Sequence, residues 1–286
     1  MGLIMPNLPK IVSVWFPPEE TGLATGIYNT GLMGGLSTGL VIAPFLPSWQ
    51  LGNYILGSIV IISGILFYLI VKDSPPGKKL PPITILEGLQ TALRSKNAWF
   101  ASLAVMTALA GMVSFQGALP GGLNKVYGIP MSKGGQITSL ITYLGILGSL
   151  TLPYFANKLK KRKLFIIVLP ISFSIIMYLT WIFGSIIIVI WLGTALAGYL
   201  AGGALPLLME VPTFLPRNKK DPVQEQHVGG VSGMLTSFMN IGGFIGLSFI
   251  VMPIIINFGY NWGFLVAAIL FAIQALFASG IAYPDN

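Results

Sequence analysis

The sequence of 286 residues contains no cysteine and few charged residues. The absence of cysteine excludes disulfide bonds and metal sites built on thiolates. Only 8% of the residues are charged and 54% are hydrophobic, whereas about 25% of a soluble domain is charged. The mean hydropathy is +0.82. This composition excludes a soluble domain and predicts a membrane protein.

Motifs for catalysis are also absent. The sequence holds no HExxH, no phosphate-binding loop and no nucleophile elbow, so we expect neither an enzyme nor a cofactor. The one histidine, His227, falls in a polar connection, and we expect it to be a solvated loop residue that binds no metal. The formal net charge is +8, but the basic residues do not form a face on a soluble domain. This argues against nucleic acid as a partner.

Eight apolar windows are long enough to cross a bilayer, which needs about 20 residues per helix. They cover residues 22–46, 51–71, 97–119, 134–156, 164–183, 185–209, 229–255 and 260–282. A ninth window, residues 1–16, is shorter and contains Pro6, Pro9 and Lys10. The predicted fold is therefore an all-α polytopic membrane bundle of about nine segments, the first of them incomplete.

That short first window corresponds in pattern to the full window 185–209, so we expect the chain to begin inside a helix. Met1 is then an internal methionine or the start of a truncated chain. The segment also lacks the basic region and the small-residue cleavage site of a secretory signal.

Lysine and arginine are concentrated on alternate connections, and connections rich in them stay in the cytoplasm. Thirteen of the sixteen basic residues belong to this set: Lys72, Lys78, Lys79, Arg94, Lys96, Lys158, Lys160, Lys161, Arg162, Lys163, Arg217, Lys219 and Lys220. The opposite connections hold only Lys125 and Lys133. We therefore expect a multi-pass protein of the cell membrane with a cytoplasmic C-terminus.

Two stretches share one pattern of an apolar helix, a proline turn containing phenylalanine, and a glycine-rich helix. Placing Gly26 on Gly233 also places Gly35 on Gly242 and Gly39 on Gly246. A long repeat in an apolar chain is typical of the duplicated bundles of secondary transporters. The glycines remove side chains from one helix face, so they either allow tight packing alone or form a surface on which two halves slide.

The longest polar connection runs from Lys72 to about Lys96 and contains P-P-G-K-K-L-P-P. Its proline spacing favours an extended linker over a packed domain. We accordingly divide the chain into an incomplete N-terminal half-bundle, residues 1–71, a central cytoplasmic loop, 72–96, and a C-terminal half-bundle of six helices, 97–286.

These features together resemble the major facilitator superfamily. The resemblance rests on V-W-F-P-P-E-E-T-G-L-A-T-G-I from Val14, on the central loop and on the basic loop N-K-L-K-K-R-K from Asn157. It covers nearly the whole chain and implies helices four to twelve of a twelve-helix transporter. The family's loop motif has a glycine and an aspartate where this chain has Pro153 and Asn157.

A charged latch is predicted at the cytoplasmic side. Glu210 ends the window 185–209 within reach of the basic loop that includes Asn157, Lys158 and Arg162. An ion pair there would close the inner side in one state and break in the other, although a plain interfacial carboxylate is an equal alternative.

Polar residues within the apolar windows are candidates for a solute cavity, because each costs free energy unless it faces the interior or water. The candidates are Lys10, Tyr28, Asn29, Gln116, Tyr143 and Asn240. Lys10 could instead extend to the interface or form a gate pair. The neutral residues could instead bond helix to helix. Gln116 stands out because Pro120 and its neighbouring glycines can interrupt the helix and free backbone carbonyls.

The resemblance implies a secondary transporter that moves a small solute through the bilayer by alternating access. The G-I-Y-N-T-G-L-M-G-G helix is similar to that of nitrate and small organic anion carriers, although no arginine lies within the windows. No carboxylate lies at the middle of a window, so the sequence identifies no coupling ion. The alternative is an inactive fragment or membrane scaffold.

Overall fold

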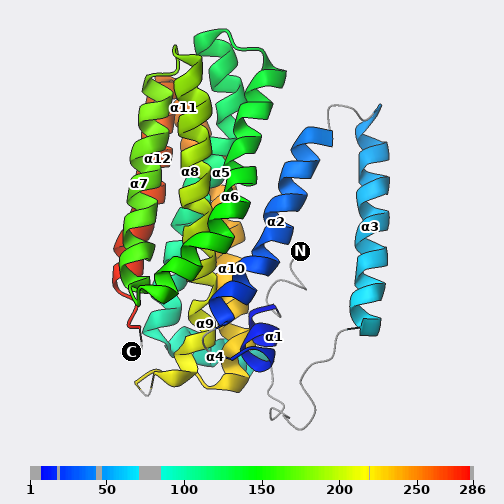
Figure 1. Ribbon diagram of the computed structural model, residues 1–286, viewed down its shortest axis with the longest axis vertical. Coiled ribbons are helices and arrows are strands. Elements are labelled where there is room, and N and C mark those ends of the chain that lie inside the picture. Colours follow the sequence, from blue (N-terminus) through cyan, green and yellow to red (C-terminus); the bar gives the residue numbers. More distant parts are fainter. Residues whose placement is uncertain (1–7, 18–19, 43–46, 71–84, 219, 284–286) are drawn as a thin grey trace.

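The computed structural model describes residues 8–17, 20–42, 47–70, 85–218 and 220–283. The described part is almost entirely helical and contains no strand (Figure 1). Its main helices are α1 (Leu8–Trp15), α2 (Thr21–Ile42), α3 (Trp49–Ile70), α4 (Ile85–Arg94), α5 (Lys96–Tyr127), α6 (Met131–Lys158), α7 (Arg162–Ile182), α8 (Ile187–Met209), α10 (Val228–Ile245), α11 (Met252–Phe258) and α12 (Tyr260–Ser279). The predicted all-α class is confirmed.

Seven described segments are long and apolar enough to cross a membrane, and they include α3, α5, α6, α7 and α12. The α8 span continues through α9 (Val211–Phe214) to Arg217, and one span runs from Glu225 to Phe258. Seven of the eight predicted windows therefore qualify. The window 22–46 became α2, which is helical but falls outside this set.

Helices α5 to α12 form one bundle around an aromatic core. The ring of Phe173 lies 4.1 Å from that of Phe271, and Trp181 lies 4.2 Å from Phe264, measured between ring centroids. Trp181 also donates its Nε1–H to Asn261 Oδ1 at 2.7 Å. These contacts join α7 to α12, and Phe115 of α5 stacks on Phe264 at 5.1 Å.

Glycines bring α6 and α8 into backbone contact. A Cβ atom on Gly148 would lie 1.9 Å from the carbonyl oxygen of Tyr199, and one on Gly202 would lie 2.0 Å from that of Gly145. Small residues of this kind drive helix association in lipid, where apolar burial gives no advantage. Any larger side chain would separate these two helices.

The tenth and eleventh helices are joined by a π-helical turn, η5 (Gly246–Val251). Pro253 follows at the second residue of α11 and has no N–H to donate to the carbonyl four residues earlier. The α-helical bond pattern cannot pass through that point unchanged, so the backbone widens just before it. The Glu225–His227 turn, η4, precedes α10.

The linker prediction was wrong for residues 85–94. They form helix α4, which packs against η4 and the start of α10. Its docked face is formed by the small residues Gly88 and Ala92, which are buried, whereas its leucines are exposed. The proline run 72–84 lies outside the described residues.

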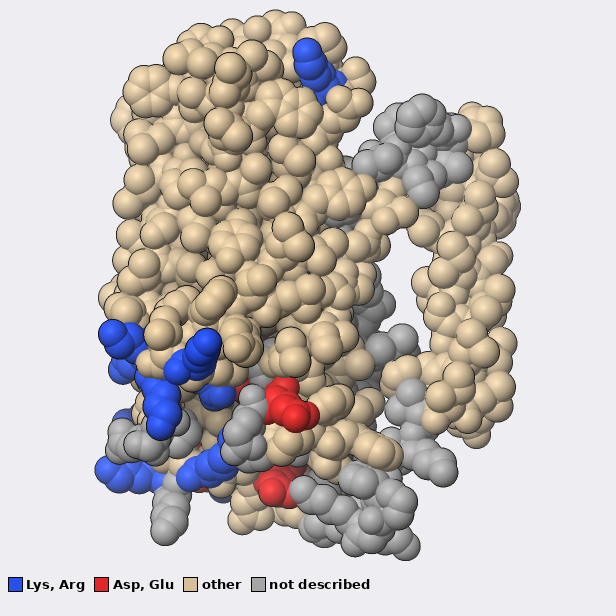
Figure 2. Space-filling view, in the orientation of Figure 1, with Lys and Arg blue, Asp and Glu red and all other residues tan. Residues whose placement is uncertain are grey.

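Helices α2 and α3 lie beside the bundle (Figure 1). The lower part of α2 packs against α6, and its upper part leans away from it. None of the apolar window of α3 is buried. On the face shown in Figure 2, the described Lys and Arg side chains gather mainly at the end of the molecule that carries α4 and the 159–161 turn, hereafter the basic end.

Candidate functional site

The predicted solute-cavity residues lie on several helices, and their common role stays a prediction. Two cavities, of about 710 and 270 Å³, lie among connections at the basic end, and neither is lined by any of those candidates. The amide of Gln116 reaches Thr142 Oγ1 across α5 and α6 at 3.5 Å, a distance at the limit of a hydrogen bond. Asn240 donates to its own helix at Thr236 O, 2.7 Å away.

The remaining candidates differ in exposure. Tyr143 is 40% exposed on α6, and Tyr28 is half-buried on α2. The side chains of Lys10 and Asn29 lie outside the described residues, so their predicted roles stay predictions.

The expected break at Pro120 was wrong, since α5 is continuous from Lys96 to Tyr127. The glycines near it serve packing instead. A Cβ atom on Gly117 would lie 2.8 Å from the side chain of Leu247, and one on Gly122 would lie 2.9 Å from the ring of Tyr260. Space for neighbouring side chains therefore accounts for these two glycines.

The clearest polar site is built around Glu210 at the C-terminal end of α8, between α8 and α9. Glu210 is 1% exposed. Glu210 Oε1 lies 3.3 Å from Arg162 Nη1 at the start of α7 and accepts a hydrogen bond of 2.9 Å from Thr21 Oγ1 at the start of α2. A buried carboxylate that accepts bonds from two separate helices fixes those helices relative to each other.

Two further basic-loop residues take different positions. Asn157 at the end of α6 accepts a hydrogen bond from Arg162 Nε through its Oδ1, so it orients the guanidinium toward Glu210. Lys158 is exposed, and its Nζ lies 5.9 Å from the ring centroid of Tyr154. The structure therefore joins Glu210, Arg162 and Asn157, and it leaves Lys158 outside this cluster.

Sequence reasoning missed Thr21 and Tyr283. Thr21 follows the Pro-Pro-Glu-Glu turn, and its place at the first residue of α2 was the available signal. Burial and the neighbouring Glu210 carboxylate raise the pKa of the Tyr283 phenol above its usual range, so this group stays neutral. Its ring packs on Phe214, with ring centroids 4.7 Å apart.

The expectation for His227 was also wrong, because it is 6% exposed and does not lie in solvent. Its Nδ1 accepts the backbone N–H of Gln224 at 3.1 Å, and its Nε2 lies 3.9 Å from Glu87 Oε1 of α4. No group of three metal-binding side chains occurs within the described ranges. His227 thus joins α4 to the start of α10.

Three of the repeated glycines lie against the backbone of a neighbouring helix, Gly26 against α6 and Gly242 and Gly246 against α5. A Cβ atom on Gly26 would lie 2.6 Å from Ser149 O of α6. Those on Gly242 and Gly246 would lie 2.0 Å from Met106 O and 2.5 Å from Ala110 Cα of α5.

The other three repeated glycines do not follow this pattern. Gly233 is half-buried in α10, and Gly39 lies outside the residues whose surroundings are described. At Gly35 close packing is not found, since no described atom lies within 4 Å of a Cβ position there. The reason is the divergence of α2 from α6 (Figure 1).

Comparison with known proteins gives one family. A family model described as Major Facilitator Superfamily matches residues 1–246. An uncharacterised transporter of Caenorhabditis elegans is 24% identical over 278 residues, covering 88% of this chain and 45% of its own. A hexuronate transporter of Bacillus subtilis is 24% identical over 272 residues, covering 86% of this chain and 61% of its own. The chain thus spans about half the length of these curated relatives.

Two further similarities extend this result. A probable nitrate/nitrite antiporter of Thermus thermophilus is 26% identical over 192 residues, which are 62% of this chain and 39% of that protein. Among solved structures, the fucose:proton symporter of Escherichia coli superposes with a TM-score of 0.70 at 13% identity, covering 98% of this chain and 74% of that chain. A second structure of that transporter, in an outward conformation, gives a TM-score of 0.66 at 14% identity, covering 99% and 72%.

Proposed function

This chain belongs to the major facilitator superfamily, and from that premise we propose that it carries the solute-translocating machinery of a secondary transporter for a small polar solute. Helices α1 to α3 then belong to one half-bundle, residues 1–71, and α5 to α12 belong to the other, residues 97–286. The two halves are proposed to expose a central site to each side of the membrane in turn.

The observation that carries this proposal is the position of Glu210. Its carboxylate binds Thr21 at the start of α2 and Arg162 at the start of α7, so one buried group joins the two proposed halves. The contact lies at the basic end, which we propose is cytoplasmic because of its lysines and arginines. Closure there, with Asn157 orienting Arg162 and Lys158 facing solvent, would be released when the site opens inward.

The divergence of α2 from α6 supports an outward-facing state. The two helices touch where Gly26 meets Ser149, near the basic end, and they separate by Gly35. Sliding at Gly26 would then accompany the change of state.

A small anion is the substrate class that we propose. It rests on similarity to transporters named for hexuronate and for nitrate and nitrite. Gln116, Thr142 and Tyr143 supply the polar groups of α5 and α6 toward such a solute. Lys10, Asn29, Tyr28 and Asn240 complete the proposed lining from the other helices.

Transport is tested by uptake into proteoliposomes that contain the purified chain, with labelled nitrate, glucuronate and fucose offered separately. Uptake of one anion above that of empty liposomes supports the proposal. Absence of uptake of all three, from protein that melts cooperatively, would favour the scaffold alternative.

Closure is tested with single cysteines, since the chain has none of its own. Ser149→Cys reports the α2–α6 contact and Gly35→Cys reports the open part of α2. The proposal predicts that Thr21→Val raises thiol labelling at position 149 about tenfold, because a hydrogen bond to a charged group contributes about 1.5 kcal/mol. Thr30→Val is the matched control on the same helix, since its hydroxyl bonds Ile27 O of that helix.

A further inference from the structure

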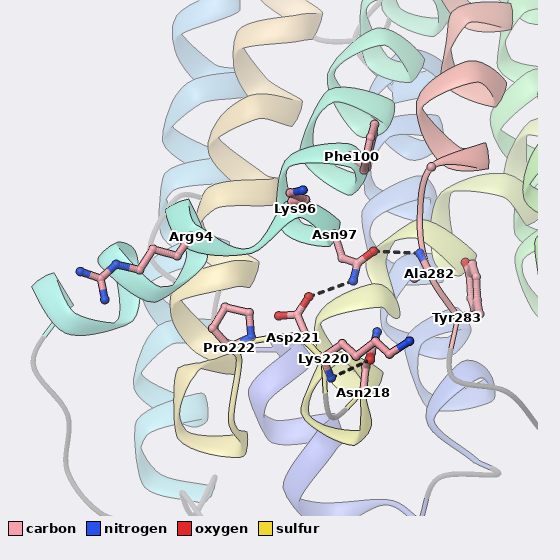
Figure 3. Close-up of a pocket in the computed structure, with 11 residues that line it drawn as sticks. Arg94, Lys96, Asn97, Phe100, Asn218, Lys220, Asp221, Pro222, Ala282 and Tyr283 are labelled. Carbon is pink, nitrogen blue, oxygen red and sulfur yellow. Dashed lines mark hydrogen bonds between the residues drawn. The ribbon is translucent and has the colours of Figure 1, made fainter.

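The larger cavity lies at the corner where α4 meets α5, and Tyr283, which neighbours Glu210, forms part of its lining. Its volume is about 710 Å³, within the usual range of about 300 to 1,000 Å³ for small-molecule sites. It is bounded by the start of α5, by the connection around Asp221 and by the segment after α12 (Figure 3). Because α5 begins and α12 ends here, the cavity lies where a spanning helix meets the headgroup region.

The floor of the cavity is held by Asp221. Its Oδ2 accepts hydrogen bonds from Ser95 Oγ and from Asn97 Nδ2, each 2.9 Å long, and its Oδ1 accepts one from Val223 N at 3.2 Å. Asn97 in turn accepts the N–H of Ala282 at 2.8 Å (Figure 3). Asp221, the one carboxylate among the described lining residues, is therefore committed to fixing three segments of the chain.

Positive charge remains in surplus around this floor. Arg94, Lys96 and Lys220 line the cavity, and no described carboxylate lies within ion-pair distance of any of them. Figure 3 shows Arg94 and Lys96 on the α4–α5 side of Asp221, with the guanidinium of Arg94 directed outward from it, and Lys220 below it. The positive end of the 32-residue helix α5 adds to the same field.

An apolar wall accompanies these cations. Phe100 lines the cavity and is 36% exposed. A cationic rim next to an exposed aromatic ring matches a ligand with an anionic head and an apolar body. Arginine and lysine at the end of a spanning helix are the groups that attract anionic headgroups.

We propose that this cavity binds a phosphate group with a net negative charge, carried by a membrane phospholipid or by a soluble phosphate. Arg94, Lys96 and Lys220 would neutralise the phosphate, and Asp221 and Asn97 would hold the walls in place. The proposed phosphate ligands are none of the residues that bond Glu210, although Tyr283 borders both places, and the proposal does not depend on transport.

The experiment uses the purified full chain in detergent. Native mass spectrometry measures the binding of phosphatidylglycerol and of phosphatidylcholine, whose choline cancels the phosphate charge. Thermal melting measures stabilisation by sodium phosphate against sodium chloride at matched ionic strength. Phosphatidylglycerol binding without a response to phosphate identifies the lipid as the source, and a response to phosphate alone identifies the soluble ion.

Two triple variants carry the same change in net charge. Arg94→Gln/Lys96→Gln/Lys220→Gln removes the cavity cations, and Lys160→Gln/Lys161→Gln/Lys163→Gln removes three exposed cations from the 159–161 turn and the first residues of α7. The first should weaken binding of the anionic ligand about fivefold per cation removed. The second should change it less than about twofold, since exposed charges at a distance are screened.

Equal losses in both triple variants would overturn the proposal, as would a wild-type chain that binds neither phosphatidylglycerol nor phosphate more than its control. If the first triple variant does not fold, Lys96→Gln and Lys220→Gln serve singly. Each should weaken binding about fivefold, and no change in either would also overturn the proposal.

Discussion

Glu210 Oε1 and Arg162 Nη1 lie 3.3 Å apart, but the two side chains differ in exposure, at 2% for Glu210 and 21% for Arg162. Removal of the arginine therefore leaves a buried carboxylate without its charge partner, whereas removal of the glutamate leaves a cation that can reach water. We expect Arg162→Met to lower stability by about 3 kcal/mol and Glu210→Gln by less.

The double variant tests this asymmetry. Glu210→Gln/Arg162→Met should be more stable than Arg162→Met alone, because no buried charge is left unpaired. Thermal unfolding in one detergent measures all four proteins. Additive losses in the double variant would show that the two groups do not interact.

Gly26 and Gly35 lie on the same helix with opposite surroundings. Gly26→Ala should lower stability, because its Cβ would lie 2.6 Å from Ser149 O, a backbone atom that cannot rotate away. Gly35→Ala should be neutral or raise stability by about 0.5 to 1 kcal/mol, since no described atom lies within 4 Å and alanine favours the helix. The same thermal measurement decides, and equal effects at both positions would contradict the α2–α6 contact.

His227 joins α4 to the start of α10. His227→Leu removes the acceptor of the Gln224 N–H bond and should cost about 1 to 2 kcal/mol. Loosening of α4 should also speed tryptic cleavage after Arg94, at the end of that helix. His227→Asn supplies an oxygen near the Nδ1 position and should recover part of both effects, whereas unchanged cleavage in His227→Leu would exclude the docking role.

Gln274 on α12 is 0% exposed, and neither of its amide atoms has a hydrogen-bond partner among the described residues. An apolar side chain of similar length removes this penalty, so Gln274→Met should raise stability by about 1 to 3 kcal/mol. Gln136→Met, at an exposed position of α6, should change it by less than about 0.5 kcal/mol. A loss of stability in Gln274→Met would contradict this prediction and would show that the Gln274 amide has a hydrogen-bond partner.

The sequence predicted the helices far better than the polar contacts. Apolar windows identified nearly every long helix, because length and hydropathy alone decide which segments cross a bilayer. Glu210 was placed near the basic loop for a similar reason, since both end on the same side of the membrane. That Glu210 pairs with Arg162 and not with Lys158 depends on the path of the chain between α6 and α7. No local sequence pattern predicts that path.

Two misses have physical causes of the same kind. His227 lies in a polar stretch, but the docking of α4 buries it, and docking is a contact between segments far apart in the chain. The glycines around Pro120 indicate a break when read alone. In the folded bundle they give room to Leu247 and to Tyr260, so the helix stays whole.

The contrast between α2 and α3 has a consequence for biosynthesis. The mean hydropathy of the α3 window is 2.0 although none of it is buried, so α3 can leave the translocon and enter lipid without a partner. Helix α2 has six glycines and several hydroxyl and amide side chains between Thr21 and Ile42. It is not among the segments that are apolar enough to cross a membrane. We therefore expect α3 to insert into the bilayer and to bring α2 with it as a helical hairpin. Helix α2 then packs against α6 at Gly26.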